Sequence, residues 1–283
     1  MNQKTGIVAF AVFIALMMII SAFAGFMMRG GNEASRTAPS DVSVQTFSIP
    51  GTLLEMDFNK IDDLLYMSPE STVTAYWIDL GVSDNLTQAA REALPQAIGL
   101  MYGSSLYQNK IERLGASYFN DSSVEFHWVK PYPVAYSSLV VPYDGFMMIP
   151  QSADYYIALS KPVFFGSLEP LKDVLDVVSG GFPTEKFNLP EGESADLQVS
   201  SLSGSKTSPP GNYQEFYMGV YKTGDSYALT VRYLKPDGST TQKIKEIANQ
   251  FGLSMATKAG AEEISGTIEQ SKLKDALTAF LQP

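Results

Sequence analysis

The feature that most constrains this chain is an uninterrupted apolar run near its start, from Gly6 to Met28. The run contains no charged residue and no proline. An α-helix rises about 1.5 Å per residue, so roughly 20 apolar residues cross the hydrocarbon core of a bilayer. Lys4 before the run and Arg29 after it stand where their side chains can reach the two interfaces. The run predicts a single-pass transmembrane helix that anchors the chain in a cell membrane, with the C-terminal part extracytoplasmic.

A cleaved signal peptide is the alternative interpretation of the same run. Lys4 supplies a positive start, residues 7–20 form an apolar region of suitable length, and Ala22 and Ala24 flank Phe23 as in a small-x-small cleavage site. The apolar sequence nevertheless continues through Met28 instead of turning polar, which favours a retained anchor.

Composition excludes several classes of function. The 283 residues carry a net charge of −10, which opposes nucleic-acid binding because that needs a basic surface. The chain has no cysteine, which excludes disulfides, thiolate nucleophiles and iron–sulfur clusters, and only one histidine, His127. We therefore expect no metal site and no cofactor.

Changes in composition divide the chain into five parts. Residues 29–48 are rich in small and polar residues and predict a tether between the anchor (residues 1–28) and a domain. Residues 49–181 alternate strand and helix patterns and predict an α+β region. Residues 182–211 contain prolines, serines and glycines and predict a linker or long loop. Residues 212–283 predict a second α+β unit.

In the first α+β region, residues 72–80 are rich in β-branched and aromatic residues and predict a buried strand. A helix is expected from Asp84 to about Leu114, broken at Pro95 and near Gly103. A hairpin over residues 116–129 follows.

Alternation in this hairpin places Val124, Phe126 and Trp128 on one face and Glu125 and His127 on the other. We expect His127 to be a satisfied or half-exposed side chain and not a functional one.

The last 70 or so residues show the clearest pattern. Two strands joined by a tight turn precede a helix that begins with a capping box at Ser239 and ends at Gly252. Two further strands and a helix that begins at Ser271 complete a ββαββα order. The fold class predicted for the whole chain is α+β, an antiparallel sheet with helices packed on it.

Tyrosines gather among prolines in residues 131–160, where the regular strand pattern fails. Tyrosine offers rigid, amphipathic contact area, so these residues are candidates for binding a partner. The alternative is that they cover edges of the core. The candidate partner-binding residues are Tyr132, Tyr136, Tyr143, Tyr155 and Tyr156.

No catalytic residue is assigned. Glycoside hydrolysis needs two carboxylates at a set separation, and the acidic pairs of the sequence are Asp62 with Asp63, Asp173 with Asp176, and Glu262 with Glu263. A helix start for Asp62 and Asp63, a solvated helix face for Asp173 and Asp176, and a turn beside Glu262 and Glu263 explain these pairs better than catalysis does.

Two glycosylation-type sequons occur, at Asn85 and Asn120. Taken together, the sequence predicts a membrane-anchored, non-catalytic binding or accessory protein of a membrane or cell-envelope assembly, whose partners are other membrane or envelope proteins. An extracytoplasmic hydrolase with paired carboxylates is the alternative.

Overall fold

The computed structural model describes residues 44–46, 49–51, 53–119, 121–132, 139–190 and 194–282. They belong to one compact unit. The helices are α2 (Ile61–Tyr66), α3 (Asp84–Ala93), α4 (Ile98–Tyr107), α5 (Leu168–Val178), α6 (Gly238–Phe251) and α7 (Leu273–Leu281), with a 3-10 turn, η1 (Gln270–Lys272). The strands are β1 (Val44–Thr46), β2 (Ile49–Gly51), β3 (Thr72–Asp79), β4 (Lys110–Phe119), β5 (Ser122–Lys130), β6 (Val141–Tyr143), β7 (Phe146–Pro150), β8 (Tyr156–Ala158), β9 (Val163–Gly166), β10 (Leu197–Leu202), β11 (Glu215–Thr223), β12 (Ser226–Leu234), β13 (Ser254–Lys258) and β14 (Ala261–Glu269).

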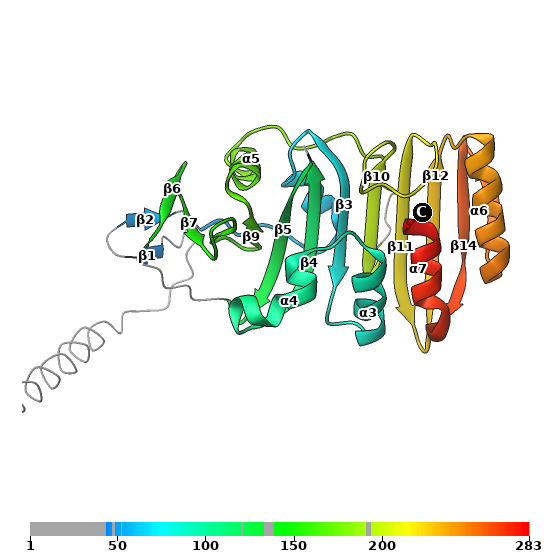
Figure 1. The fold of residues 1–283 in the computed structure, drawn as a ribbon, viewed down its shortest axis with the longest axis horizontal. Coiled ribbons are helices and arrows are strands. Elements are labelled where there is room, and N and C mark those ends of the chain that lie inside the picture. The colour runs from blue at the N-terminus through cyan, green and yellow to red at the C-terminus, as the bar shows by residue number, and fades with distance from the viewer. Residues whose placement is uncertain are drawn as a thin grey trace, which may run out of the picture. The chain divides into compact units, whose positions relative to one another are not determined.

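One antiparallel sheet of 12 strands organises the unit, in the order β13-β14-β12-β11-β10-β3-β4-β5-β9-β8-β7-β6. The long strands from β14 to β5 stand side by side, and the short strands continue the sheet at the other end (Figure 1). Strands β1 and β2 form a separate two-stranded ribbon.

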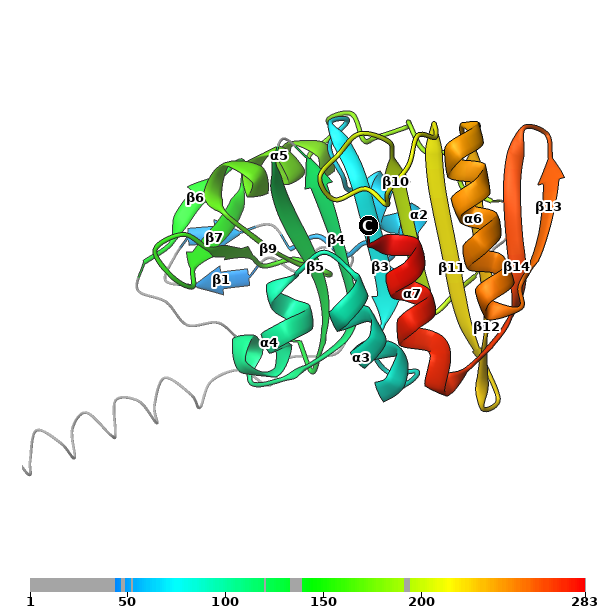
Figure 2. The same cartoon turned by 45° about the vertical axis from the view of Figure 1, so that its right-hand side comes forward.

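Four helices, α3, α4, α6 and α7, cover one face of the sheet (Figure 2). Each contributes an apolar stripe to the core on that face, for example Leu86 from α3, Leu100 from α4 and Phe280 from α7. Helices α2 and α5 pack on the opposite face, where Leu64 and Leu171 meet Trp77 and Phe126 of the strands. Helices thus lie on both faces, and burial of their stripes against the sheet is the main apolar contribution to stability.

Local sequence explains the regular half of the sheet. Alternate residues of β12 are buried, as expected of a strand with one face in the core. Asp237 begins α6 by accepting a hydrogen bond from Thr240 N at 2.7 Å, and Gly252 ends it with φ of 67°. The capping residue is therefore Asp237, while the predicted Ser239 lies inside the first turn and donates its hydroxyl to Asp237.

The structure confirms an α+β fold with a large antiparallel sheet and confirms the ββαββα order from β11 to α7. The predicted anchor, the alternative signal peptide and most of the tether lie outside the described residues. In the part of the chain that the structure describes, no helix is both long enough and apolar enough to cross a bilayer.

Two predictions need correction. The helix expected from Asp84 to about Leu114 ends at Tyr107, because residues from Lys110 onward carry a strand pattern and form β4. The linker expected over residues 182–211 contains β10, which pairs with both β3 and β11 near the middle of the sheet. The described residues on both sides of it therefore belong to one sheet, not two structural units.

Strand β10 was not predicted because its serines resemble those of a linker. Leu197 and Val199 face the core while Gln198 and Ser200 point to the other side, so the strand alternates as usual. Its polar side chains are buried because they have partners: Gln198 Oε1 accepts from Ile61 N at 2.7 Å, and the Ser201 and Thr74 hydroxyls lie 2.7 Å apart.

Candidate functional site

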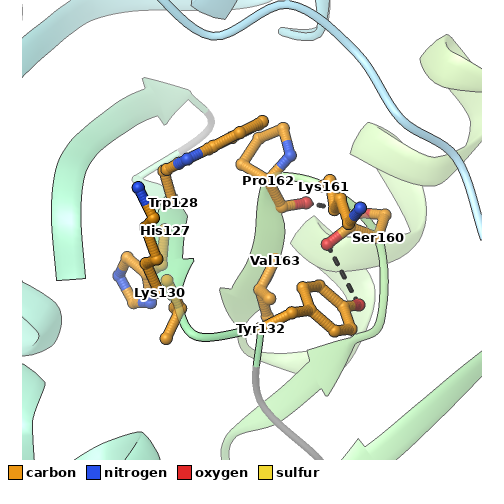
Figure 3. Close-up of a pocket in the computed structure, with 9 residues that line it drawn as sticks. His127, Trp128, Lys130, Tyr132, Ser160, Lys161, Pro162 and Val163 are labelled. Carbon is orange, nitrogen blue, oxygen red and sulfur yellow. Dashed lines mark hydrogen bonds between the residues drawn. The ribbon is translucent and has the colours of Figure 1, made fainter. Parts of the chain in front are cut away.

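The candidate site is a gap between two strands that begin paired and then separate. Strands β5 and β9 pair from Val124↔Gly166 to His127↔Val163. Beyond that point β5 continues to Lys130 alongside β4, whereas residues 160–162 turn away. The gap is a pocket of about 260 Å³ (Figure 3). Its lining residues are His127, Trp128, Val129, Lys130, Tyr132, Ser160, Lys161, Pro162 and Val163.

Internal hydrogen bonds hold the wall around Ser160. The Tyr132 hydroxyl donates to Ser160 O at 3.2 Å, and Ser160 Oγ donates to Pro162 O at 2.5 Å. Both bonds are drawn in Figure 3, where the Tyr132 ring reaches across to the Ser160 backbone. Burial raises the pKa of Tyr132, so its hydroxyl stays protonated and remains a donor.

The pocket is locally basic in an acidic protein. Among the described residues that line it, Lys130 and Lys161 are positively charged and none is a carboxylate. Lys161 Nζ lies 5.7 Å from the centre of the Tyr132 ring and 3.4 Å from Glu55 Oε2. Lys130 Nζ lies 3.8 Å from Glu112 Oε1. The side-chain exposure is 32% for Lys161 and 71% for Lys130, so Lys161 is the inner of the two cations.

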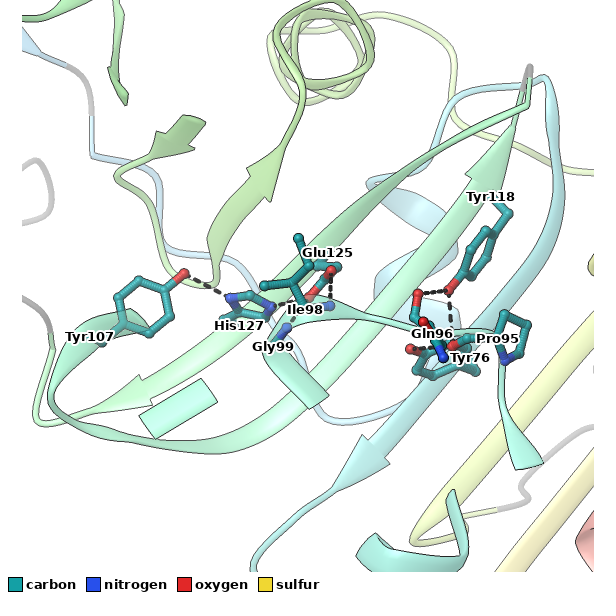
Figure 4. A network of polar contacts seen from close by, with 9 residues as sticks. All are labelled: Tyr76, Pro95, Gln96, Ile98, Gly99, Tyr107, Tyr118, Glu125 and His127. Atoms are coloured by element: carbon teal, nitrogen blue, oxygen red, sulfur yellow. Dashed lines mark hydrogen bonds and ion pairs between the residues drawn. The ribbon is translucent and has the colours of Figure 1, made fainter. Parts of the chain in front are cut away.

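Directly beside the pocket lies a buried polar network, shown in Figure 4. The Glu125 carboxylate accepts from Ile98 N and Gly99 N, both at 2.6 Å, and therefore caps the N-terminus of α4 from a strand. His127 Nε2 lies 2.9 Å from Glu125 Oε2, and its Nδ1 lies 2.7 Å from the hydroxyl of Tyr107 at the end of α4.

This network is structural in its geometry. Both ring nitrogens of His127 are engaged, and its side chain has an exposure of 0%, so it is not presented to the pocket as an acid or base. The expectation that His127 is a satisfied side chain is confirmed. The role of Glu125 was not predicted from the sequence, although its position two residues before His127 on the same strand face was a usable signal.

The predicted tyrosines do not gather on one surface. Tyr132 packs against the core under α4 and lines the pocket, and Tyr155 stacks on Phe165 at 5.3 Å. Tyr143 and Tyr156 pack against the core on the opposite face of the sheet. The Tyr143 hydroxyl donates to Asp176 Oδ1 at 2.7 Å. Tyr136 lies outside the described residues.

In each of the three acidic pairs, at least one carboxylate has a hydrogen-bond or ion-pair partner. Asp63 accepts from Asn59 N, Lys60 pairs with Asp62, and Lys258 pairs with Glu263. The remaining pair, Asp173 and Asp176, lines an open hollow of about 490 Å³ together with Pro69, Glu70, Ser71 and Lys186. Burial, followed by the charges of Asp176 and Glu169, raises the pKa of Asp173.

Asn85 is exposed in the first turn of α3, and Asn120 lies outside the described residues. Within the described residues, no three histidine, aspartate or glutamate side chains are grouped so that they could hold a metal ion.

Comparison with known proteins defines the class of fold. No family model and no curated protein matches the chain. Among solved structures, crystal form III of TP0453 matches with a TM-score of 0.50 and 10% identity, over 76% of this chain and 98% of that chain. Crystal form I of TP0453 matches at a TM-score of 0.49 and 10% identity, over 76% of this chain and 97% of that one. At this identity the first match shows a shared α+β fold and nothing about activity.

Proposed function

We propose that the chain is a membrane-anchored, extracytoplasmic, non-catalytic binding protein that serves as an accessory component of a membrane or cell-envelope assembly. The observation that carries the proposal is the apolar run from Gly6 to Met28, which is long enough to span a bilayer and precedes a folded domain. The charge of −10 supports partners that are proteins or small molecules and not nucleic acid.

The pocket between β5 and residues 160–162 is the surface to which we assign binding. It combines an indole, a phenol and two ammonium groups at the point where the regular sheet gives way to short strands. Aromatic and basic side chains in a concave site supply both contact area and orientation. Tyr132, one of the predicted tyrosines, belongs to this surface.

Topology is the first thing to test. Membranes that contain the full chain are washed with alkaline carbonate, and the intact mass of the retained protein is measured. We expect the protein to stay in the membrane fraction at its full mass and its domain to be cleaved by protease added to spheroplasts. Release by carbonate, or loss of about 24 residues as after signal-peptide cleavage, contradicts the anchor.

Binding is tested by affinity purification of the full chain from native membranes. Lys130→Glu reverses a charge at the mouth of the pocket, and Lys206→Glu, whose side chain is 87% exposed elsewhere, is the matched control. We expect co-purification of the partner to fall about fivefold or more with Lys130→Glu only, because this variant reverses a charge beside the surface that the partner contacts. Equal recovery with both variants and with the unaltered chain contradicts the assignment.

One observation favours the second candidate, a hydrolase with paired carboxylates. Glu70, Asp173 and Asp176 line one hollow, and the raised pKa of Asp173 is the shift expected of a general acid. Turnover of a panel of nitrophenyl glycosides that is abolished by Asp173→Asn, but not by Asp275→Asn on the surface of α7, would replace the binding proposal with this one.

A further inference from the structure

The pocket between β5 and residues 160–162 has two lysines in its lining, Lys130 and Lys161. Lys161 is two-thirds buried in its wall, and its ammonium group, which carries three N–H donors, lies 3.4 Å from the carboxylate of the exposed Glu55. Lys130 adds a second cation at the mouth. An anion that enters the pocket therefore meets two ammonium groups, each of which also lies within 4 Å of one carboxylate, Glu55 for Lys161 and Glu112 for Lys130.

The pocket offers few free hydrogen-bond donors to a neutral polar ligand. The hydroxyls of Tyr132 and Ser160 already donate to backbone carbonyls of the wall, at Ser160 and Pro162. The lysine ammonium groups therefore remain as the strongest hydrogen-bond donors toward a ligand, because hydrogen bonds from charged donors are stronger than those from neutral ones.

The remaining walls are mainly apolar. Trp128 contributes an indole, and Pro162 and Val163 contribute aliphatic surface (Figure 3). Val129 also lines the pocket. The volume of about 260 Å³ lies below the usual range for drug-sized ligands, roughly 300–1,000 Å³, so a single ring or a short branched chain fills it.

We propose that this pocket binds a small organic anion, in which an aromatic ring or short apolar group lies against Trp128 and Pro162 and a carboxylate or phosphate pairs with Lys161 and Lys130. The inference rests on the proposed function, because it names the ligand class of the same site. The anion is either a free small molecule or the anionic end of an envelope lipid, and both present the same chemistry.

Tryptophan fluorescence of the full chain in phosphatidylcholine nanodiscs tests the proposal. The chain has two tryptophans; Trp128 lines the pocket and Trp77 lies in the core on the α2 side. The probes are phenylacetate and phenylacetamide, which have similar shapes and differ in charge. We expect phenylacetate to change the tryptophan fluorescence saturably, with a Kd below about 10 mM. The Kd for phenylacetamide should be at least about tenfold higher.

Variants connect the signal to the lysines. Lys161→Met is expected to lower the affinity for phenylacetate about tenfold. Lys130→Met should lower it less, because Lys130 is more exposed, and Lys206→Met should leave it unchanged. The backbone bonds of Lys161 to Leu54 and Met56 do not depend on its side chain, and Lys161→Gln serves if the Met variant misfolds. Inorganic phosphate, the third probe, should bind more weakly than phenylacetate.

Three results would overturn the proposal: equal affinity for acid and amide, phosphate binding as tight as phenylacetate binding, or no effect of Lys161→Met or Lys161→Gln. Repeating the titration with phosphatidylglycerol in the nanodiscs separates the two sources, because a lipid headgroup in the pocket raises the apparent Kd for phenylacetate. Failure of the titration while Lys130→Glu still lowers co-purification refutes the ligand class alone. If phenylacetate binds as expected but alkaline carbonate releases the protein from membranes, only the proposal of a membrane-anchored function is refuted.

Discussion

The two ends of the sheet are built differently. At one end, β11 and β12 pair over their whole length, from Glu215↔Leu234 to Thr223↔Ser226, and β12 pairs in the same continuous way with β14. At the other end, β6, β7 and β8 pair with their neighbours over three residues each. The pocket lies in the second region, where β9 separates from β5.

Proline accounts for much of this difference. Pro142, Pro150 and Pro162 stand in or beside the short strands and cannot donate a ladder hydrogen bond. The β11–β12 hairpin contains no proline and turns through Gly224 at φ of 62°. Continuous pairing leaves no space between strands. Where pairing is interrupted a pocket remains, and side-chain hydrogen bonds such as that of Tyr132 to Ser160 hold its wall in place of ladder hydrogen bonds.

The largest effect is expected in the regular end. Phe216 is fully buried, and its ring centre lies 4.9 Å from that of Tyr233. Phe216→Ala should lower the free energy of unfolding by about 3–5 kcal/mol, measured by denaturant titration, because it leaves a cavity in the core. Tyr221→Ala, at a 45% exposed position of the same strand, is the control and should change it by about 0.5 kcal/mol or less. A comparable loss in both variants would contradict the regular packing of this end.

A smaller effect is expected beside the pocket. A Cβ at Gly99 would lie 2.7 Å from His127 Cε1, and His127 is held by Tyr107 and Glu125. Gly99→Ala should destabilise the protein by about 1–3 kcal/mol in the same assay, because the ring has no free direction in which to move.

Gly103→Ala in the same helix is the matched comparison. The Cβ there would meet Ile111 Cδ1, the end of a flexible side chain, so this variant should be near neutral. Equal losses for the two variants would show that the histidine is not held as the structure indicates.

The wall of the pocket should depend on a single hydroxyl. Tyr132→Phe removes the hydrogen bond to Ser160 O and should cost about 0.5–1.5 kcal/mol at neutral pH. Burial raises the pKa of Tyr132, so the unfolded chain loses the proton first. The contribution is therefore complete below about pH 10 and falls as the pH rises past it. Denaturation of both proteins at several pH values checks this, and a difference that grows above pH 10 would contradict it.

The smallest effect is expected at the exposed start of α6. Hydrogen bonds from Thr240 N, the Thr240 and Ser239 hydroxyls and Asn212 lower the pKa of Asp237. Its stabilising contribution is present above the unfolded pKa of about 3.9 and is lost as the pH falls below it. The Tm of Asp237→Ala should lie below that of the unaltered protein at neutral pH and approach it in acid. A constant difference down to about pH 2 would show that the carboxylate charge is not involved.

The regular end could be predicted from sequence because its information is local. Alternation in β12, the turn at Gly224 and the glycine that ends α6 all act within a few residues. Strand β10 could not be predicted in this way. Its buried serines have hydrogen-bond partners on neighbouring strands, Thr74 for Ser201 and the carbonyl oxygen of Phe216 for Ser200, which a local pattern does not contain.

The candidate site was predictable in part. Broken strand patterns indicated residues 131–160, and Tyr132 does line the pocket. The other half of the pocket, Trp128 and Lys130, comes from a strand that looked ordinary in sequence. Tyr155 and Tyr156 are adjacent, so their separation to opposite faces of the sheet followed from strand geometry and should have argued against one tyrosine surface.

The attachment of α4 to β5 has a consequence for how this part of the protein opens. The first amides of a helix ordinarily have no partner in the helix and exchange their hydrogens with water rapidly. Here the amides of Ile98 and Gly99 bind a carboxylate that belongs to β5, while Tyr107 at the far end of α4 binds a histidine of the same strand. Neither end of α4 can fray without breaking a bond to β5, so these two amides should exchange as slowly as the strand does, and the helix should open only together with that wall of the pocket.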